Sequence, residues 1–118
     1  MSAQALPLLT PRARQSGGSC QPFVEPDLSA AEAAEMAVKI KALADPTRLQ
    51  IVDALRKSAP EAVCQCELTP LFAMSQQALS KHVKVLIAAK ILGSERRAVW
   101  TYYFVLPGAL ERIHAWLS

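Results

Sequence analysis

The most constraining feature of this sequence is a set of helix-start signals that follow one another closely. Ser29 is followed by Glu32 at the spacing of a capping box, in which each side chain accepts a hydrogen bond from a backbone N–H. Asp45 followed by Pro46 also predicts a helix start, with Asp45 as the cap. Proline is tolerated at the first helical position because a backbone N–H there would have no partner within the helix. Ser75 predicts a further start. A chain with starts this close together builds its core from several short helices.

Apolar residues recur at helical spacing between these signals and the breakers that follow them. A further short helix contains Pro70, and since proline is tolerated only in a first turn, we expect this helix to begin near Cys66 or Glu67. That start would leave Cys64 and Cys66 at a frayed helix entrance. The segments predicted to be helical are 29–44, 45–57, about 66–72, a helix of about 14 residues after Ser75 in a region that Gly93 ends, and a last one from Pro107.

The stretch 94–106 alternates between two faces, as a strand does. With 93–97 as its partner, it predicts a two-stranded hairpin, and we expect its aromatic residues to form the hairpin core. Short helices followed by a β-ribbon indicate a mainly α fold with a two-stranded β-wing, an α+β winged helix-turn-helix. The aromatic residues are Trp100, Tyr102, Tyr103 and Phe104.

The domain organisation follows from composition. Residues 1–27 hold half of the 8 prolines and a Gly17-Gly18 pair, so they are predicted to be a flexible N-terminal arm. Residues 28–118 are predicted to form the single folded domain. The sequence shows neither a membrane-length apolar run nor a signal-peptide core, so we expect a cytoplasmic protein without a membrane partner.

Charge divides the folded part of the chain. Between positions 25 and 45 the chain has five acidic residues and two lysines. Between positions 75 and 100 it has five basic residues and one acidic residue, Glu95. A basic half beside an acidic half predicts a face for a polyanion, with an ordinary solvated surface as the alternative.

The helix predicted after Ser75 carries small polar and basic residues on its outer face, and the DNA major groove admits one helix. Two glutamines at its start can make two-pronged hydrogen bonds to adenine, and a serine and two lysines follow at positions suited to phosphates or guanine. Two arginines at the hairpin tip are placed for the backbone or the minor groove. A lone histidine beside Val83 is more typical of packing or hydrogen bonding than of metal ligation. The candidate DNA-binding residues are Gln76, Gln77, Ser80, Lys81, His82, Lys84, Arg96 and Arg97.

Four runs of residues, in order, resemble the ArsR/SmtB family of metal-responsive repressors. ALADPTRL at 42–49 resembles its "LxDPxRL" signature, and CQCEL at 64–68 looks like its "CVCDL" metal box. SQQALSKHVKVL at 75–86 is similar to its recognition helix, and RRAVWTYY at 96–103 to its wing. The resemblance spans about residues 29–106. It implies a homodimer, paired through its first and last helices, that binds palindromic operator DNA when metal-free and releases it when metal binds.

The wing turn departs from the family pattern. Relatives often carry Gly-Arg where this chain has Ala98-Val99. Alanine at a positive φ costs about 1 kcal/mol, so we expect a different turn, with DNA contact left to Arg96 or Arg97.

The resemblance makes the cysteines candidate metal ligands. Cys64 and Cys66 would point about 200° apart on a regular helix, so they could share an ion only if the helix entrance unwinds. Trivalent arsenic and antimony prefer a pyramidal three-sulfur site, and Cys20 on the arm is the only other cysteine. We therefore predict that Cys20, Cys64 and Cys66 bind As(III) or Sb(III) as inducer, without an organic cofactor.

Alternatives remain at this point. Cys20 could be no part of the metal site. The repressor could also respond to Cd(II), Pb(II) or Zn(II) instead, or it could respond to oxidation of its thiols. The last helix offers only His114 as a histidine, which we expect at the surface or an interface. A thiol oxidoreductase is disfavoured because the Cys-x-x-Cys spacing is missing, so the chain is not expected to be an enzyme. A purely protein-binding winged helix is disfavoured by the basic face.

Overall fold

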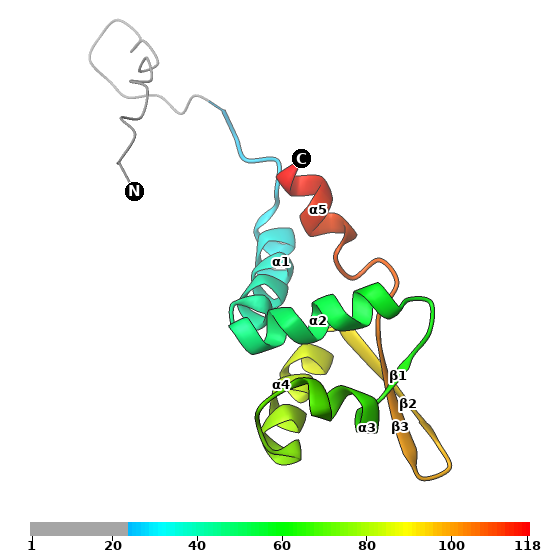
Figure 1. The fold of residues 1–118 in the computed structure, drawn as a ribbon. Coiled ribbons are helices and arrows are strands. Elements are labelled where there is room, and N and C mark those ends of the chain that lie inside the picture. Colours follow the sequence, from blue (N-terminus) through cyan, green and yellow to red (C-terminus); the bar gives the residue numbers. More distant parts are fainter. Residues whose placement is uncertain (1–23) are drawn as a thin grey trace, which may run out of the picture.

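The computed structural model describes residues 24–118, and residues 1–23, most of the predicted arm, lie outside this part (Figure 1). Within it, helices alternate with a small antiparallel sheet, and no helix is long and apolar enough to cross a bilayer. The elements are α1 (Ala30–Leu43), α2 (Pro46–Ser58), β1 (Val63–Cys64), α3 (Gln65–Leu68), the 3-10 helix η1 (Thr69–Leu71), α4 (Gln76–Ala88), β2 (Leu92–Arg97), β3 (Trp100–Val105) and α5 (Glu111–Leu117).

The predicted helix starts are confirmed. Ser29 Oγ accepts a hydrogen bond from the Glu32 backbone N–H at 3.1 Å, and the Glu32 carboxylate accepts one from the Ser29 N–H, which completes the capping box of α1. Asp45 caps α2 with Pro46 in the first turn, and Ser75 Oγ accepts from a backbone N–H of α4 at 3.1 Å. Local side-chain chemistry therefore sets where the helices begin.

Two helix boundaries differ from the prediction. α3 begins at Gln65, one residue before the predicted start, because Pro70 lies not in α3 but in the first turn of η1, where its missing N–H leaves no bond unmade. α5 begins at Glu111 rather than Pro107, because residues 107–110 form turns, with Gly108 at φ 77. Glycine adopts that conformation without steric cost, so it holds the chain out of a helix.

The wing is part of a three-stranded sheet in the order β1-β3-β2. The predicted β2–β3 hairpin is present, with Arg97 opposite Trp100. β1 adds a strand that was not predicted and pairs Cys64 with Tyr102. A strand of two residues is too short to show any periodicity, which is why the sequence pattern missed it.

The aromatic residues of the hairpin do not form its core together. Tyr103 is buried, whereas Trp100 is 51% exposed. Alternation explains the split, because Tyr103 faces the helices while Trp100 lies on the other face of β3. On that outer face, a Cβ on Gly93 would come within 2.7 Å of the Phe104 ring, so a larger residue would force the ring to move.

The core joins α2, α4 and the start of β2. Figure 1 shows the wing tip, α3 and α4 at one end of the molecule, with α5 and the C-terminus at the opposite end. The most deeply buried side chains are Ile51, Leu55, Leu68, Leu79, Val83, Leu86, Ile91 and Leu92.

Candidate nucleic-acid interface and thiol pair

α4 presents a polar face outward and an apolar face inward. Leu79, Val83 and Leu86 are buried, as the helical period predicts. Both glutamines and both lysines of the predicted DNA-binding set are exposed, and Ser80 is half-buried. The polar face borders a shallow hollow of about 440 Å³ whose lining residues are Gln65, Gln76, Gln77, Ser80, Lys81 and Lys84.

His82 lies apart from that hollow and ties α4 to the start of α2. Its Nδ1 is 3.3 Å from Nη1 of Arg48, and the Arg48 Nε–H donates to the backbone oxygen of Ala42. Asp45 Oδ2 is 3.8 Å from the same Nδ1. The hydrogen bond from the Arg48 backbone N–H holds the pKa of Asp45 below its usual value, as do the charges of Arg48 and His82. The geometry fits a hydrogen-bonding residue that sets the position of α4.

The wing tip carries both predicted arginines, and both are exposed. Arg97 Nε donates to the Glu95 carboxylate at 3.1 Å, and Arg96 Nε donates to the Ala98 carbonyl at 3.3 Å. Ala98 has φ 56, so the chain keeps a positive φ at the turn although no glycine is present. The expectation that alanine would exclude this conformation is wrong, and the turn carries the strain instead.

The two cysteines of the described residues lie together. Cys66 Sγ is 2.7 Å from Cys64 Sγ, and the Cys66 S–H donates a hydrogen bond to that sulfur; Cys64 is buried and Cys66 exposed. The predicted condition, a helix entrance that is not regular at the cysteines, is met because Cys64 is not helical. It ends β1 and caps α3 with an extended backbone, ψ 141, so the helical step of 100° does not separate the side chains.

The surroundings of the Cys66 thiol favour its protonated form. The hydrogen bond that its S–H donates to Cys64 raises the pKa of Cys66, and loss of some solvent contact and the charges of Cys64 and Glu67 raise it further. Glu67 also accepts a hydrogen bond from the Cys64 N–H at 3.3 Å, which fixes the backbone at this point. The pair is therefore a preformed set of two soft donors.

A hollow of about 430 Å³ beside the thiols reaches both candidate DNA-binding elements. It is lined by Cys64 and Cys66, by Gln76 at the start of α4, and by Val99 and Trp100 at the wing tip. Between residues 24 and 118, no three His, Cys, Asp or Glu side chains gather as a metal site, and the predicted third ligand, Cys20, lies outside these residues. Sequence reasoning missed Trp100 as a neighbour of the thiols because β1 gave no signal.

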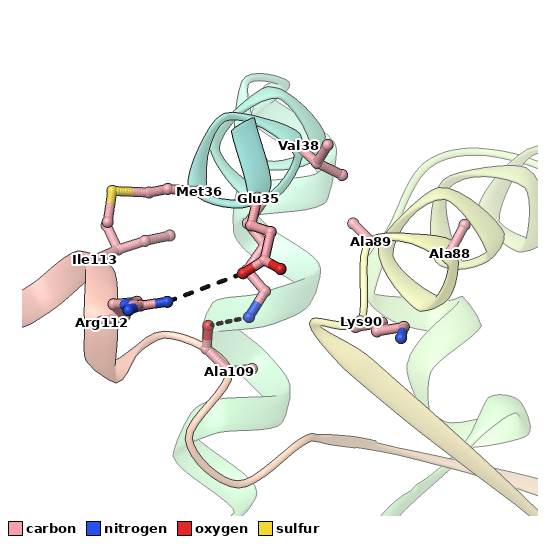
Figure 2. Close-up of a pocket in the computed structure, with 10 residues that line it drawn as sticks. Glu35, Met36, Val38, Ala88, Ala89, Lys90, Ala109, Arg112 and Ile113 are labelled. Atoms are coloured by element: carbon pink, nitrogen blue, oxygen red, sulfur yellow. Dashed lines mark hydrogen bonds and ion pairs between the residues drawn. The ribbon is translucent and has the colours of Figure 1, made fainter. Parts of the chain in front are cut away.

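The opposite end of the molecule has an apolar surface formed by α1 and α5. Figure 2 shows the hollow of about 360 Å³ between these helices and the end of α4, where Arg112 points toward Glu35 and Lys39 donates to the Ala109 carbonyl at 3.1 Å. α5 has no buried residue, and His114 is exposed as expected. The exposed large apolar residues of α1 and α5 are Val38, Ile40, Trp116 and Leu117.

These features define the class of protein. α3 with η1, the turn before Ser75 and α4 form a helix-turn-helix, and β2 and β3 form the wing beside it. The chain is therefore a winged helix-turn-helix protein, as predicted.

Comparison with known proteins identifies the family. The family model described as "Bacterial regulatory protein, arsR family" matches residues 45–92. The arsenical resistance operon repressor of Bacillus subtilis strain 168 is 40% identical over 65 residues, which are 55% of this chain and 60% of that protein. The chain belongs to the ArsR family, whose members are transcriptional regulators and not enzymes.

Two further proteins are similar to this chain. The arsenic resistance transcriptional regulator ArsR1 of Pseudomonas putida strain KT2440 is 32% identical over 81 residues, 69% of this chain and 62% of that protein. The crystal structure of NolR from Sinorhizobium fredii has a TM-score of 0.61 at 32% identity, covering 80% of this chain and 94% of that one. The match spans only about three fifths of the two arsenic-related proteins, 60% and 62% of their lengths.

Proposed function

We propose that this chain is a homodimeric repressor of an arsenic-resistance operon in the cytoplasm. It occupies palindromic operator DNA and leaves it when As(III) or Sb(III) binds the thiolates of Cys20, Cys64 and Cys66. The observation that carries this proposal is the place of the thiol pair, in one hollow with Gln76 of α4 and Trp100 of the wing. A ligand captured there contacts the two elements that the fold offers to DNA.

The DNA contacts follow from the outer face of α4. Gln76 and Gln77 at its first turn read base edges in the major groove, while Lys81 and Lys84 meet phosphates or guanine. The arginines of the wing tip, Arg96 and Arg97, reach the backbone or the adjacent minor groove. Ser80 supplies a hydroxyl between these groups. His82 contributes through its bond to Arg48, which fixes the orientation of α4.

The homodimer is supported by the surface that α1 and α5 leave uncovered. Trp116 is 54% exposed and Leu117 70% exposed in a single chain, and large apolar side chains left this exposed favour an interaction surface on α5. A twofold axis through this surface covers the same residues on both protomers. It also presents two α4 helices, which is why the operator is palindromic.

The thiol site fits a soft trivalent metalloid. Its two sulfur atoms are already within 2.7 Å of each other, and Cys20 supplies the third sulfur of a pyramidal site. Binding displaces the protons of both thiols, each sulfur–metalloid bond replacing one S–H, and so removes the hydrogen bond between the two sulfurs. Because Cys64 belongs to β1 and caps α3, that change acts on the wing through β3 and on the segment leading into α4. The loaded protein then favours a conformation that fits DNA poorly.

The test uses the full chain and an operator from the DNA next to its own gene. Fluorescence anisotropy should show tight binding by the metal-free protein, with affinity falling steeply as salt rises. Arsenite should release the DNA as sulfur–arsenic absorbance appears in the ultraviolet. The double variant Cys64→Ser, Cys66→Ser should bind DNA but no longer respond, whereas Gln65→Ser, between the two cysteines, should still respond.

The alternatives are arms of the same experiment. Release by Cd(II), Pb(II), Zn(II) or peroxide but not by arsenite would overturn the assignment of the inducer. A response to arsenite that is unchanged in Cys20→Ser would remove Cys20 from the site. Release that persists in the double cysteine variant would overturn the thiol site itself.

A further inference from the structure

One residue outside α4 lines the hollow on the polar face of that helix. Gln65, the first residue of α3, borders this hollow of about 440 Å³, and the other lining residues belong to α4. Their side chains carry amides, a hydroxyl and two ammonium groups, and no carboxylate is among them. Groups that donate hydrogen bonds, without an acid beside them, suit an anionic phosphate. The hollow therefore extends the proposed DNA-binding face from α4 onto the start of α3.

Gln65 also borders the thiol hollow. That second hollow, of about 430 Å³, is lined by Gln65 and Gln76 as well as by the two cysteines, so these two glutamines border both hollows. Gln65 is half-buried, and its backbone carbonyl accepts a hydrogen bond from the Thr69 hydroxyl at 2.9 Å. Among the described residues, its side-chain amide has no hydrogen-bond partner. The main chain of Gln65 is thus held, while its amide is available to a ligand.

The place of α3 in the fold favours DNA as that ligand. α3 with η1 is the first helix of the helix-turn-helix, and such a helix crosses the DNA backbone when the second helix enters the major groove. Figure 1 shows α3 between α4 and the strands of the wing, and residues of all three line the thiol hollow. A side chain at the start of α3 is therefore placed for the backbone of the same DNA that α4 reads.

We infer that Gln65 is a further DNA contact, whose amide donates to a backbone phosphate beside the groove that receives α4, and that ligand capture by the thiols removes this contact. The inference rests on the proposed function and names the residue that links its two sites. Cys64 and Cys66 flank Gln65, and in the metal-free chain their sulfurs are hydrogen-bonded to each other. Once both sulfurs are bonded to one metalloid atom, the segment that joins them must adjust, and the Gln65 amide moves with it.

The experiment measures DNA affinity of the full-length chain by fluorescence anisotropy, with and without arsenite. Without arsenite, Gln65→Ala should weaken binding by about tenfold, because one hydrogen bond is lost on each protomer. The loss should be equal on the operator and on an unrelated duplex, since a phosphate contact carries no sequence information. With arsenite, the variant should bind as weakly as the unmodified chain does, because the contact is then already absent. Arsenite should still release DNA from this variant, because both thiols remain.

Gln65→Lys tests the same contact by a gain. An ammonium group at this place should steepen the dependence of affinity on salt, by about one in the slope for each phosphate that it neutralises. An effect on folding alone would not change that slope. Gln50 on α2 is exposed and lines neither hollow, so Gln50→Ala and Gln50→Lys are the matched controls and should change neither affinity nor slope.

Three results would overturn the inference. They are a Gln65→Ala chain that binds as tightly as the unmodified one, an equal loss of affinity with and without arsenite, and a salt slope that Gln65→Lys leaves unchanged. A loss confined to the operator sequence would also overturn it, because the side chain would then read a base. The proposed function fails in a different measurement, through an unmodified chain that binds arsenite without releasing its operator.

Discussion

The proposed function assigns DNA binding to α4 and dimerisation to α5, and these two helices differ in how firmly the rest of the chain holds them. α4 buries Leu79, Val83 and Leu86, is capped by Ser75, and is bonded through His82 to the start of α2. α5 is about half as long, has no side-chain cap and contains no fully buried residue. A single chain therefore fixes the helix proposed to read DNA, whereas it leaves the apolar side of α5 for a second chain to cover.

The largest expected effect is on the α4 side of this comparison. Leu86 is fully buried, so Leu86→Ala should lower the free energy of unfolding by about 2–5 kcal/mol, because apolar burial is removed and a cavity is left. Leu117→Ala, at a residue 70% exposed, should cost less than about 0.5 kcal/mol at a protein concentration where the chain is monomeric. Urea unfolding measures both. If the two variants lost equal free energy of unfolding at every protein concentration, α5 would belong to the same core as α4.

The next effect concerns the surface that α5 leaves open. Trp116→Glu puts a charge into the proposed dimer interface, so sedimentation should show a monomer and operator affinity should fall by about a hundredfold, because the two α4 helices are no longer linked. Leu49→Glu on α2, where Leu49 is 53% exposed, is the matched control and should leave the dimer intact. A Trp116→Glu protein that remains dimeric would show that another surface forms the dimer.

The same contrast explains what the sequence could and could not predict. α4 was predicted well because its cap and apolar stripe are local signals that its own chain satisfies. The sequence predicts a start of α5 at Pro107 because proline is common in first turns. In the structure the chain forms a turn around Gly108 instead, and the helix begins only after it. The closeness of the thiols depends on β1, whose two residues gain their strand conformation only by pairing with β3. Pairing between distant segments leaves no periodic trace in a sequence.

A smaller effect separates two roles on the exposed face of α4. Lys81→Ala should weaken binding to every DNA sequence by about tenfold, and it should lower the slope of affinity against salt by about one if the lysine neutralises one phosphate. Gln77→Ala should change the preference at one base pair in each half-site and leave the salt slope unchanged. Anisotropy titrations over a range of salt, on the operator and on single-base variants, measure both. The roles would be exchanged if the salt slope moved with Gln77 instead.

The smallest effect tests how α4 ends. Lys90 has φ 60, while the next residue, Ile91, donates its N–H to the Leu86 carbonyl at 3.0 Å, so a lysine holds the left-handed position that usually belongs to glycine. Lys90→Gly should therefore raise the free energy of unfolding by up to about 1 kcal/mol, since it removes the clash of Cβ with the backbone. Lys90→Ala is the control, because it removes the same charge but keeps the Cβ and should gain nothing. Thermal unfolding of the two variants side by side measures the difference. A gain in both variants would attribute the effect to the lysine charge at the end of the helix. The positive φ at Lys90 would then cost no measurable free energy, and α4 would end without backbone strain.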